Sequence, residues 1–440
     1  MANHDWNESA SASTARQILQ RLFRDFDGSA RFRLWDGSEV SLGGNSPDFA
    51  LTFRTPNVLQ KMVLTRHPLR LVESYFQGLI DLDGNLYSAL RLRHYLSSLR
   101  LSLGEKAMLT AKALMINPVS ARTEGGDARR WSKTLRQTLG LEADKSLNRN
   151  AISFHYDVSN DFYALWLDEQ MIYSCAYFER AEQSLEQAQC NKLDHICRKL
   201  RLRPGERLLD IGCGWGALIC WATEHYGVHA HGITLSRKQY EHVQKTIRQR
   251  GLENKVSVEL RDYRDLQGEG VYDKLVSVGM FEHVGLKNLP TYFAIAHRQL
   301  KPGGLFLNHG ITSDTHGWKK SVTTEFINRY VFPDGQLETV STVQQMMEEA
   351  NLEIHDVESL RRHYALTLRE WVKRLDANHE AALQYVSESV YRVWRLYMAA
   401  CAMQFEEGEI GVYQILSSRR APFVSPLPLT RRDLYGNDNA

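Results

Sequence analysis

The residues best suited to bind a ligand lie in one short stretch, 210–216, where three glycines stand at alternate positions directly after Asp210 and Ile211. A loop of this kind lets the backbone turn sharply and lie against a flat ligand, since a Cβ atom there would collide with it. The spacing differs from the Gly-x-Gly-x-x-Gly of dinucleotide sites, and no phosphate-loop Gly-Lys-Ser/Thr follows. The pattern favours a ligand that joins a nucleoside to an amino acid, with a tight structural turn as the alternative.

Strands and helices alternate around this loop. Residues 184–187 have the spacing of a capping box ahead of a helix to about residue 200, and Ser236 and Gln239 repeat that spacing. The apolar pattern predicts further helices at 217–226 and 289–300, and strands at 207–211, 228–235, 256–260, 272–279 and 305–308. Strands separated by helices of this length predict an α/β fold, a parallel, doubly wound sheet that binds ligands at the carboxyl ends of its strands.

The N-terminal third follows a different pattern. Residues 19–55 alternate like short strands, with strands expected at 30–35, 39–42 and 49–53, whereas residues 58–115 have a helical period. We therefore expect a compact α+β module over residues 1–120 and a basic linker over 121–149. Between Arg91 and Arg149 stand 12 basic and five acidic residues. This surplus indicates either a solvated linker or a surface for anionic phosphates, and no motif supports nucleic acid.

Composition limits the class of protein. The 440 residues carry a formal charge of +2 and 43% of them are hydrophobic, and the mainly polar stretch 1–16 has Asp5 and Glu8 where a secretory signal would have an apolar core. No apolar run approaches the roughly 18 residues that a membrane-spanning helix requires, so we expect a cytoplasmic protein. None of the six cysteines forms a Cys-x-x-Cys pair, and we expect reduced thiols and no metal site.

Six blocks of sequence resemble one family in order and spacing. Over residues 150 to about 420 the chain resembles cyclopropane-fatty-acyl-phospholipid synthases and the related mycolic acid methyltransferases. The resemblance implies a Rossmann-like, class I S-adenosylmethionine-dependent methyltransferase domain over residues 150–430, preceded by a lipid-binding domain over residues 1–120. The blocks are residues 154–157, 173–178, 209–216, 232–236, 262–265 and 277–285.

The resemblance also implies a cofactor site. Most methyltransferases end the second strand of the sheet in an acid that binds the ribose, whereas this chain has Thr234, Leu235 and Ser236 there, as the family does. The ammonium group of S-adenosylmethionine is expected near Asp210. The residues expected to contact the cofactor are Tyr173, Ser174, Asp210, Gly212, Gly214, Gly216, Thr234, Leu235, Gln239, Asp262 and Tyr263.

The reaction that the resemblance implies is methyl transfer to an unactivated cis double bond. Such an alkene has no proton to lose before attack, so transfer leaves a carbocation, and ring closure requires removal of a proton from the new methyl group. The resemblance implies a bound bicarbonate as part of the base, with Glu282 accepting the relayed proton and His309 and Tyr364 donating hydrogen bonds. The expected bicarbonate residues are Cys175, Glu282, His309, Ile311 and Tyr364.

The N-terminal module bears on the substrate. It resembles the lipid-binding domain of the members that modify bacterial phospholipids, so we expect unsaturated acyl chains of membrane phospholipids, peripheral association with the inner, anionic membrane face, and a homodimer. Three alternatives remain open. They are a related enzyme that makes methyl-branched or methylene fatty acids, a catalytically inactive lipid-binding protein, and a methyltransferase for polar substrates on the same fold.

Overall fold

The chain forms two compact units. The computed structural model describes residues 2–44, 46–65, 69–116, 158–317, 325, 337–421 and 427–435. The first unit comprises Met1–Glu142 and Val386–Ala400, and the second comprises Ala143–Tyr385 and Cys401–Ala440. The expected linker 121–149 and the motif at 154–157 lie outside the described residues. Residues 386–400 therefore return to the first unit from far along the chain, which continuous sequence ranges do not anticipate.

A four-stranded sheet forms the centre of the first unit. Its order is β2-β1-β3-β4, with β1 parallel to β3 and the other pairs antiparallel. The three strands expected from the sequence are confirmed at β1 (Ala30–Arg33), β2 (Glu39–Leu42) and β3 (Phe49–Phe53). The fourth, β4 (Ile80–Gly84), interrupts the stretch expected to be helical. Its acidic residues Asp81 and Asp83 hide the strand signal, and long-range pairing with β3 decides its conformation.

Helices pack around this sheet. Residues 19–22, expected at the start of a strand region, instead end the helix α1, whose buried Ala12, Ala15, Ile18 and Leu19 recur every three or four residues. These side chains join Phe32 and other sheet residues in one apolar core. The helices are α1 (Ala2–Leu22), α2 (Pro56–Thr65), α3 (Leu69–Phe76), α4 (Leu86–Leu90), α5 (Leu92–Ser98) and α6 (Leu103–Ile116).

The second unit contains a seven-stranded sheet in the order β10-β11-β9-β8-β5-β6-β7. The expected parallel strands are confirmed as β5 (Arg207–Ile211), β6 (His229–Thr234), β7 (Val256–Leu260), β8 (Tyr272–Val278) and β9 (Leu300–Ser313). However, β11 (Ile410–Arg419) lies antiparallel between β9 and β10 (Leu352–Ser359). Strand and helix alternation does not reveal this reversal, because strand direction depends on where the helices between β10 and β11 bring the chain back.

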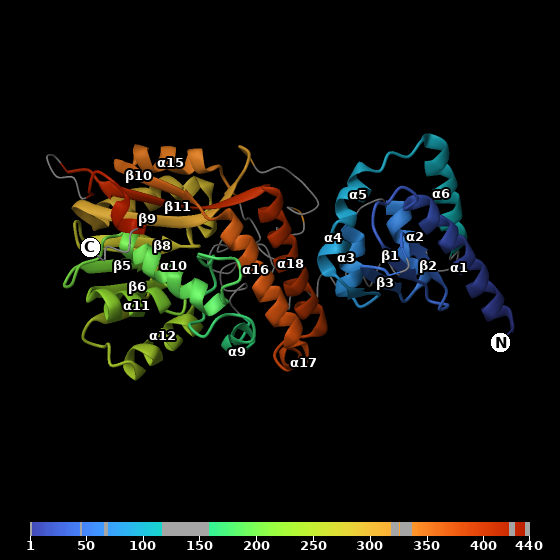
Figure 1. Ribbon diagram of the computed structural model, residues 1–440, viewed down its shortest axis with the longest axis horizontal. Helices are drawn as coiled ribbons and strands as arrows, with labels where there is room; N and C mark the ends of the chain where they lie inside the picture. The colour runs from blue at the N-terminus through green and yellow to red at the C-terminus, as the bar shows by residue number, and fades with distance from the viewer. Residues whose placement is uncertain are drawn as a thin grey trace. The chain divides into compact units, whose positions relative to one another are not determined.

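Two layers of helices enclose the sheet (Figure 1). Side chains from α10 (Leu185–Lys199), α11 (Ala217–Tyr226) and α12 (Arg237–Gln249) share a core with Leu208. Side chains from α13 (Leu289–Gln299) and α15 (Val340–Glu349) share another core with Leu209. Successive residues of β5 thus point into opposite cores, as a central strand requires. The strand ends remain uncovered for a ligand.

Local signals fix where the key helices begin. Ser184 caps α10 by accepting a hydrogen bond from the Gln187 N–H at 3.2 Å, and Ser236 caps α12 by accepting one from the Gln239 N–H at 3.4 Å. Both caps were expected from the sequence. The remaining helices are α9 (Asn160–Ala164), α16 (Arg361–Ala377), α17 (His379–Ala382), α18 (Glu388–Glu407) and α19 (Arg432–Tyr435).

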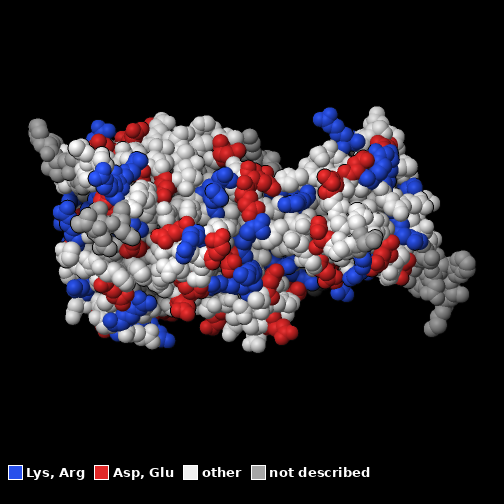
Figure 2. Space-filling model, viewed as in Figure 1, with Lys and Arg blue, Asp and Glu red and all other residues white. Residues whose placement is uncertain are grey.

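The surface carries mixed charge. On the face shown in Figure 2, lysines and arginines are interspersed with aspartates and glutamates.

Within the described part of the chain, no helix is both long and apolar enough to cross a bilayer.

Candidate active site

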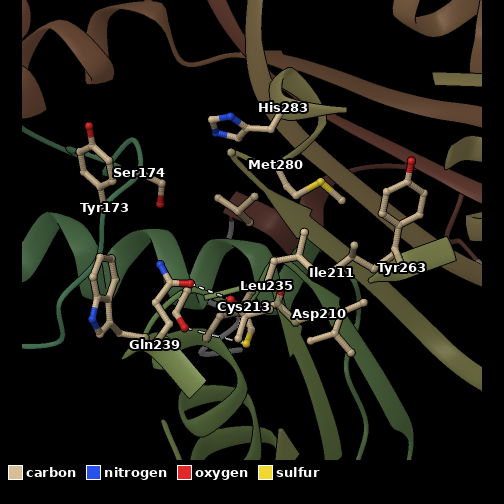
Figure 3. Close-up of a pocket in the computed structure, with 18 of the residues that line it drawn as sticks. Tyr173, Ser174, Asp210, Ile211, Cys213, Leu235, Gln239, Tyr263, Met280 and His283 are labelled. Atoms are coloured by element: carbon tan, nitrogen blue, oxygen red, sulfur yellow. Dashed lines mark hydrogen bonds between the residues drawn. The ribbon is translucent and has the colours of Figure 1, made fainter. Parts of the chain in front are cut away.

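A cleft lies at the carboxyl ends of the central strands. Strand order reverses at β5, whose two neighbours are β6 and β8, and such switch points are where open α/β sheets bind ligands. The segments after β5, β6, β7 and β8 all contribute to the cleft lining. Ten of the eleven expected cofactor residues line it: Tyr173, Ser174, Asp210, Gly212, Gly214, Thr234, Leu235, Gln239, Asp262 and Tyr263. Figure 3 shows Tyr173 and Tyr263 on opposite sides of it.

The glycines of the loop differ in what they do. All three have positive φ values, 86° at Gly212, 55° at Gly214 and 86° at Gly216. A Cβ atom on Gly214 would meet no protein atom within 4 Å, so the loop leaves open space where a ligand fits. A Cβ atom on Gly216 would lie 2.9 Å from Val243 Cγ1. Gly216 is not among the residues that line the cleft, and its lack of a side chain lets α11 pack against α12.

The end of β6 presents an amide instead of an acid. The Thr234 hydroxyl donates to Gln239 Oε1 at 2.7 Å and accepts from the Ser236 N–H at 3.1 Å. Thr234 and Gln239 are both about 5% exposed. The backbone N–H of Gln239 takes part in the helix cap, and its side chain has a second role at the cleft. The side-chain oxygen is held there by the hydrogen bond from Thr234 (Figure 3).

A second loop, after β7, is fixed by an ion pair. The guanidinium group of Arg264 binds Asp262 through Nε at 2.9 Å and Nη2 at 2.6 Å, which is a two-point contact. The Arg264 guanidinium also lies over the Tyr263 ring, with its Cζ 5.8 Å from the ring centroid. The Tyr263 ring meets the Tyr292 ring edge-on, with 5.4 Å between the two centroids. Asp262 and Tyr263 both line the cleft, and Arg264 is the residue that holds them.

Aromatic rings form one wall of the cleft. The Tyr173 ring lies 5.6 Å from Tyr163, 5.5 Å from Trp166 and 5.3 Å from Trp371. Tyr163 in turn lies 5.0 Å from the cleft residue Trp215. Trp166 and Trp371 are fully buried. These packed rings connect the cofactor cleft to α16, on which Trp371 lies.

Glu282 stands beside the cleft with half of its carboxylate unpaired. Its Oε1 accepts the Ile311 N–H at 2.7 Å, while its Oε2 is buried without a hydrogen-bond partner. A Cβ atom on Gly310 would overlap the Phe281 ring and lie 3.0 Å from Glu282 Oε1, so glycine is required for this close approach. Burial raises the pKa of Glu282 to about 7, although the Ile311 hydrogen bond opposes the shift. The carboxylate can take up or release a proton near neutral pH.

His309 lies on β9 and is 1% exposed. Its Nδ1 lies 3.3 Å from Gln414 Nε2 on the paired strand β11. Burial, together with the nearby charges of Lys192 and Lys199, lowers the pKa of His309 to about 3. The imidazole is therefore neutral at physiological pH, so it can donate one hydrogen bond and accept another.

Helix α16 holds the segment that contains Cys175. The Ala176 N–H donates to Thr367 Oγ1 and the Phe178 N–H donates to His363 Nδ1, both at 3.0 Å. The buried Cys175 thiol lies 3.7 Å from the Leu360 carbonyl oxygen, just before this helix. Burial raises the pKa of that thiol, so it is not a nucleophile.

The Leu360 carbonyl, which lies near the Cys175 thiol, also accepts a hydrogen bond from the Tyr364 N–H at 3.0 Å. Its ring packs 4.7 Å from Phe405 and 6.0 Å from Trp371. Leu360 donates its N–H to Val412 at 2.8 Å, and Val412 pairs with Ile311. A chain of contacts through Leu360 and Val412 thus links Cys175 and Tyr364 to Ile311, which binds Glu282, and His309 lies two positions before Ile311 on β9.

The structure differs from the sequence expectations in two ways. None of the five expected bicarbonate residues lines the cleft itself, whereas His283, the neighbour of Glu282 in the sequence, does. Burial lowers the pKa of His283 to about 4, which keeps it neutral. Lys192 also lines the cleft, although a lysine within an amphipathic helix ordinarily indicates a solvated face. Its burial depends on how α10 packs on the sheet.

Comparisons with known proteins agree with this geometry. The family described as mycolic acid cyclopropane synthetase matches residues 143–415. A probable fatty acid methyltransferase of Pseudomonas putida is 41% identical over 413 residues, covering 92% of this chain and 96% of the relative. The cyclopropane-fatty-acyl-phospholipid synthase of Escherichia coli is 42% identical over 266 residues, covering 60% of this chain and 66% of that enzyme.

Solved structures share the fold. The mycolic acid cyclopropane synthase CmaA1, crystallised with SAH and CTAB, is 37% identical, with a TM-score of 0.59 over 61% of this chain and 98% of its own. The Rossmann-like methyltransferase fold expected from the sequence is therefore confirmed.

Proposed function

Because the chain belongs to the mycolic acid cyclopropane synthetase family and is an S-adenosylmethionine-dependent methyltransferase, we propose that it transfers a methyl carbon to the cis double bond of lipid acyl chains and makes cyclopropane fatty acids. S-adenosylmethionine supplies the electrophilic methyl group when bound. The observation that carries the proposal is Glu282, a buried carboxylate beside the cleft with one oxygen fixed by Ile311 and the other unpaired. Methyl transfer to an alkene needs such a proton acceptor only after the new bond forms.

The residues of the chain fit the cofactor. Gly214 leaves room for a flat ligand, Gln239 and Thr234 form an amide and hydroxyl pair at the end of β6, and the Asp210 carboxylate has a buried oxygen without a partner. A nucleoside presents hydroxyls and ring nitrogens, and an amino acid presents an ammonium group. The cleft offers complementary groups for both.

The residues beside the cleft also fit bicarbonate. A small anion that accepts and donates hydrogen bonds suits the unpaired Glu282 oxygen and the neutral His309, and Cys175, Ile311 and Tyr364 belong to the same chain of contacts as Glu282. Bicarbonate would supply a base close to the substrate carbon. Glu282 then holds or releases the proton at the edge of the cleft, and the rings around Trp371 exclude water.

The proposed substrate is an unsaturated acyl chain of a membrane phospholipid. We also propose that the protein binds peripherally to an anionic bilayer surface and forms a homodimer. A second candidate product, a methyl-branched or methylene fatty acid, is favoured by the fatty acid methyltransferase that matches over 92% of this chain. The two products share the same carbocation and differ only in how its charge is removed.

Product identification tests the proposal. Purified protein is incubated with cis-unsaturated phospholipid vesicles and methyl-labelled S-adenosylmethionine, and the released fatty acids are analysed by mass and proton spectra. We expect label in a fatty acid that gains one CH₂ and shows cyclopropane protons. Vesicles of saturated phospholipid are the control and should take up no label.

Each of the other possible outcomes would assign a different activity to the protein. Olefinic methylene protons or a methyl branch would replace the cyclopropane product with the second candidate. Binding of vesicles without incorporation of label would indicate a lipid-binding protein without catalysis. Label that appears in a polar acceptor, with no response to added vesicles, would assign a polar-substrate methyltransferase.

A further inference from the structure

A lysine is buried in the cofactor cleft. Lys192, on α10, is 2% exposed and lines the cleft. Its Nζ donates to the Ser174 hydroxyl at 2.9 Å, and Ser174 is itself a cleft residue. Burying an ammonium group is costly unless a negative charge compensates it. The surroundings of Lys192 therefore indicate what it binds.

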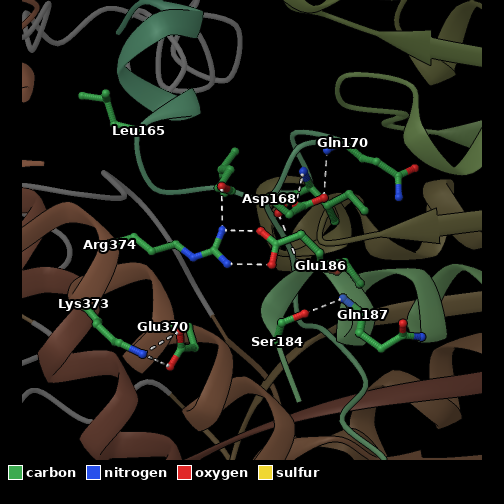
Figure 4. Close-up of polar contacts among 12 residues, drawn as sticks. Leu165, Asp168, Gln170, Ser184, Glu186, Gln187, Glu370, Lys373 and Arg374 are labelled. Atoms are coloured by element: carbon green, nitrogen blue, oxygen red, sulfur yellow. Dashed lines mark hydrogen bonds and ion pairs between the residues drawn. The ribbon is translucent and has the colours of Figure 1, made fainter. Parts of the chain in front are cut away.

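Four titratable groups interact electrostatically with this ammonium: Asp168, Cys175, Asp210 and the neutral His309. Asp168 is already engaged, because its two oxygens accept the N–H groups of Gln170 and Ile172 at 3.0 and 2.9 Å (Figure 4). The buried Cys175 thiol is neutral, because burial raises its pKa. Asp210 is the carboxylate that remains, and its Oδ1 is buried without a partner.

The position of Lys192 is rigidly fixed. At the start of α10, Glu186 forms an ion pair with Arg374 of α16 at 2.7 Å, and Arg374 also donates to the Leu167 carbonyl at 3.1 Å (Figure 4). At its other end, Lys199 lies 3.2 Å from Asp356. The helix that carries Lys192 is thus anchored on both sides of the cleft residue.

We propose that Lys192 binds the carboxylate at the amino-acid end of S-adenosylmethionine. With Asp210, near which the resemblance already implies the ammonium group, it would complete a paired-charge subsite. Both side chains line one cleft and are almost completely buried. Ser174 accepts from Lys192 and orients it. A ligand with one positive and one negative end satisfies both groups at once, whereas a singly charged ligand leaves one of them unpaired. The inference rests on the cofactor assignment made above.

The charge states are compatible with this role. Burial lowers the pKa of Lys192 to about 8 and raises that of Asp210 to about 7, so near neutral pH both are close to losing their charge in the free protein. A bound zwitterion favours the charged form of each. Binding should therefore move the pKa of Lys192 upward and that of Asp210 downward.

Calorimetry with two ligands tests the subsite. S-adenosylhomocysteine has the amino-acid end, whereas 5′-methylthioadenosine has the same nucleoside and sulfur without it. We expect Lys192→Met to weaken binding of S-adenosylhomocysteine at least tenfold and to leave binding of 5′-methylthioadenosine unchanged. Asp210→Asn should show the same selective loss.

The other results overturn the inference. An equal loss for both ligands would make Lys192 a structural residue of the cleft, and no loss for either would remove it from the site. If Lys192→Met fails to fold, as a thermal unfolding scan would show, the unmodified protein is titrated with decarboxylated S-adenosylhomocysteine. That ligand should bind at least tenfold more weakly than the intact one, and equal binding would refute the role of Lys192. Failure of the unmodified protein to bind S-adenosylhomocysteine would instead refute the cofactor assignment itself.

Discussion

Two carboxylates with raised pKa values distinguish this site. Burial brings both Glu282 and Asp210 to a pKa of about 7, yet they occupy different places, since Asp210 lines the cofactor cleft and Glu282 stands beside it. The two histidines do not exchange protons near neutral pH, because burial lowers the pKa of His309 to about 3 and that of His283 to about 4. The groups that can exchange a proton near neutral pH are therefore Glu282, Asp210 and Lys192, since burial lowers the pKa of Lys192 to about 8.

Glu282→Gln should separate catalysis from binding. The amide keeps the size of the side chain and can still accept the Ile311 N–H, but it cannot take a proton. We expect turnover of labelled methyl into lipid to fall by about 10²–10⁴-fold, while the affinity for S-adenosylhomocysteine, measured by calorimetry, stays within about twofold. Unchanged turnover would remove Glu282 from the base.

The pH dependence of turnover should follow the same group. Only the ionised carboxylate is a base, so kcat at saturating cofactor should fall about tenfold per pH unit as the pH drops below about 7. Saturating cofactor is needed because Asp210 loses its charge in the same range and weakens binding. Asp210→Asn is the control, and it should retain this decline in kcat. A flat profile from pH 5 to 8 would contradict the assignment.

At the scale of elements, the loop after β5 combines a ligand function and a packing function. Gly214 faces open space in the cleft, whereas Gly216 begins α11 against Val243. Both residues have left-handed backbone conformations, so alanine at either position carries a similar backbone cost of about 1–2 kcal/mol. The two positions differ in what the added methyl group would meet, which is open space at Gly214 and the Val243 side chain at Gly216.

Gly214→Ala and Gly216→Ala form a matched pair that tests this division. We expect Gly214→Ala to lose binding of S-adenosylhomocysteine by more than tenfold with only the backbone cost in stability. Gly216→Ala should lower the unfolding temperature further, because its methyl group would press on Val243. Calorimetry and thermal unfolding of both variants provide the comparison. Normal ligand affinity in Gly214→Ala would refute the placement of the cofactor.

Helix α16 has a comparable positioning role. Thr367 and His363, one turn apart, accept the N–H groups of Ala176 and Phe178, and the Thr367 hydroxyl donates to the His363 carbonyl. The Cys175 segment is therefore held by the same helix that carries Tyr364. A shift of this helix would move both sides of the proposed bicarbonate site together.

At the scale of the whole molecule, the chain returns to its first unit through α18. Residues 386–400 belong to that unit, and Arg392 donates to the carbonyls of Tyr75 and Ile80 and to Asp81, at 2.9–3.0 Å. The guanidinium also lies over the Tyr75 ring at 5.0 Å. One side chain from far along the sequence thus fixes the end of α3 and the start of β4.

Arg392→Met should destabilise the first unit. It removes the donors to two carbonyls and to Asp81, and hydrogen bonds to charged groups are worth about 1.5–3 kcal/mol. We expect hydrogen exchange of the β3 and β4 amides to accelerate by about 30-fold or more, with little change in β5 and β6. Arg237→Met is the control, because Arg237 is 72% exposed and its ion pair is worth little. Unchanged exchange in β4 would show that α18 does not support this unit.

Local signals in the sequence determined much of this protein. The capping serines 184 and 236, the glycine loop and the alternating strands each depend on residues a few positions apart, so they could be read without the fold. The resemblance to a family, and not a local pattern, indicated the ten expected cofactor residues that line the cleft. Those that follow β5, β6 and β7 meet there because the ends of parallel strands share one edge of a sheet.

Only the tertiary structure decided the remainder, because burial and long-range pairing are not local. Lys192 looks like a surface residue until α10 packs on the sheet, and β4 looks helical until it pairs with β3. Gly216 matches the loop motif but packs against Val243. The antiparallel β11 brings Val412 beside Ile311 and so joins Tyr364 to Glu282 across more than 80 residues of sequence. Such contacts arise when distant segments exclude water together, which a sequence motif does not record.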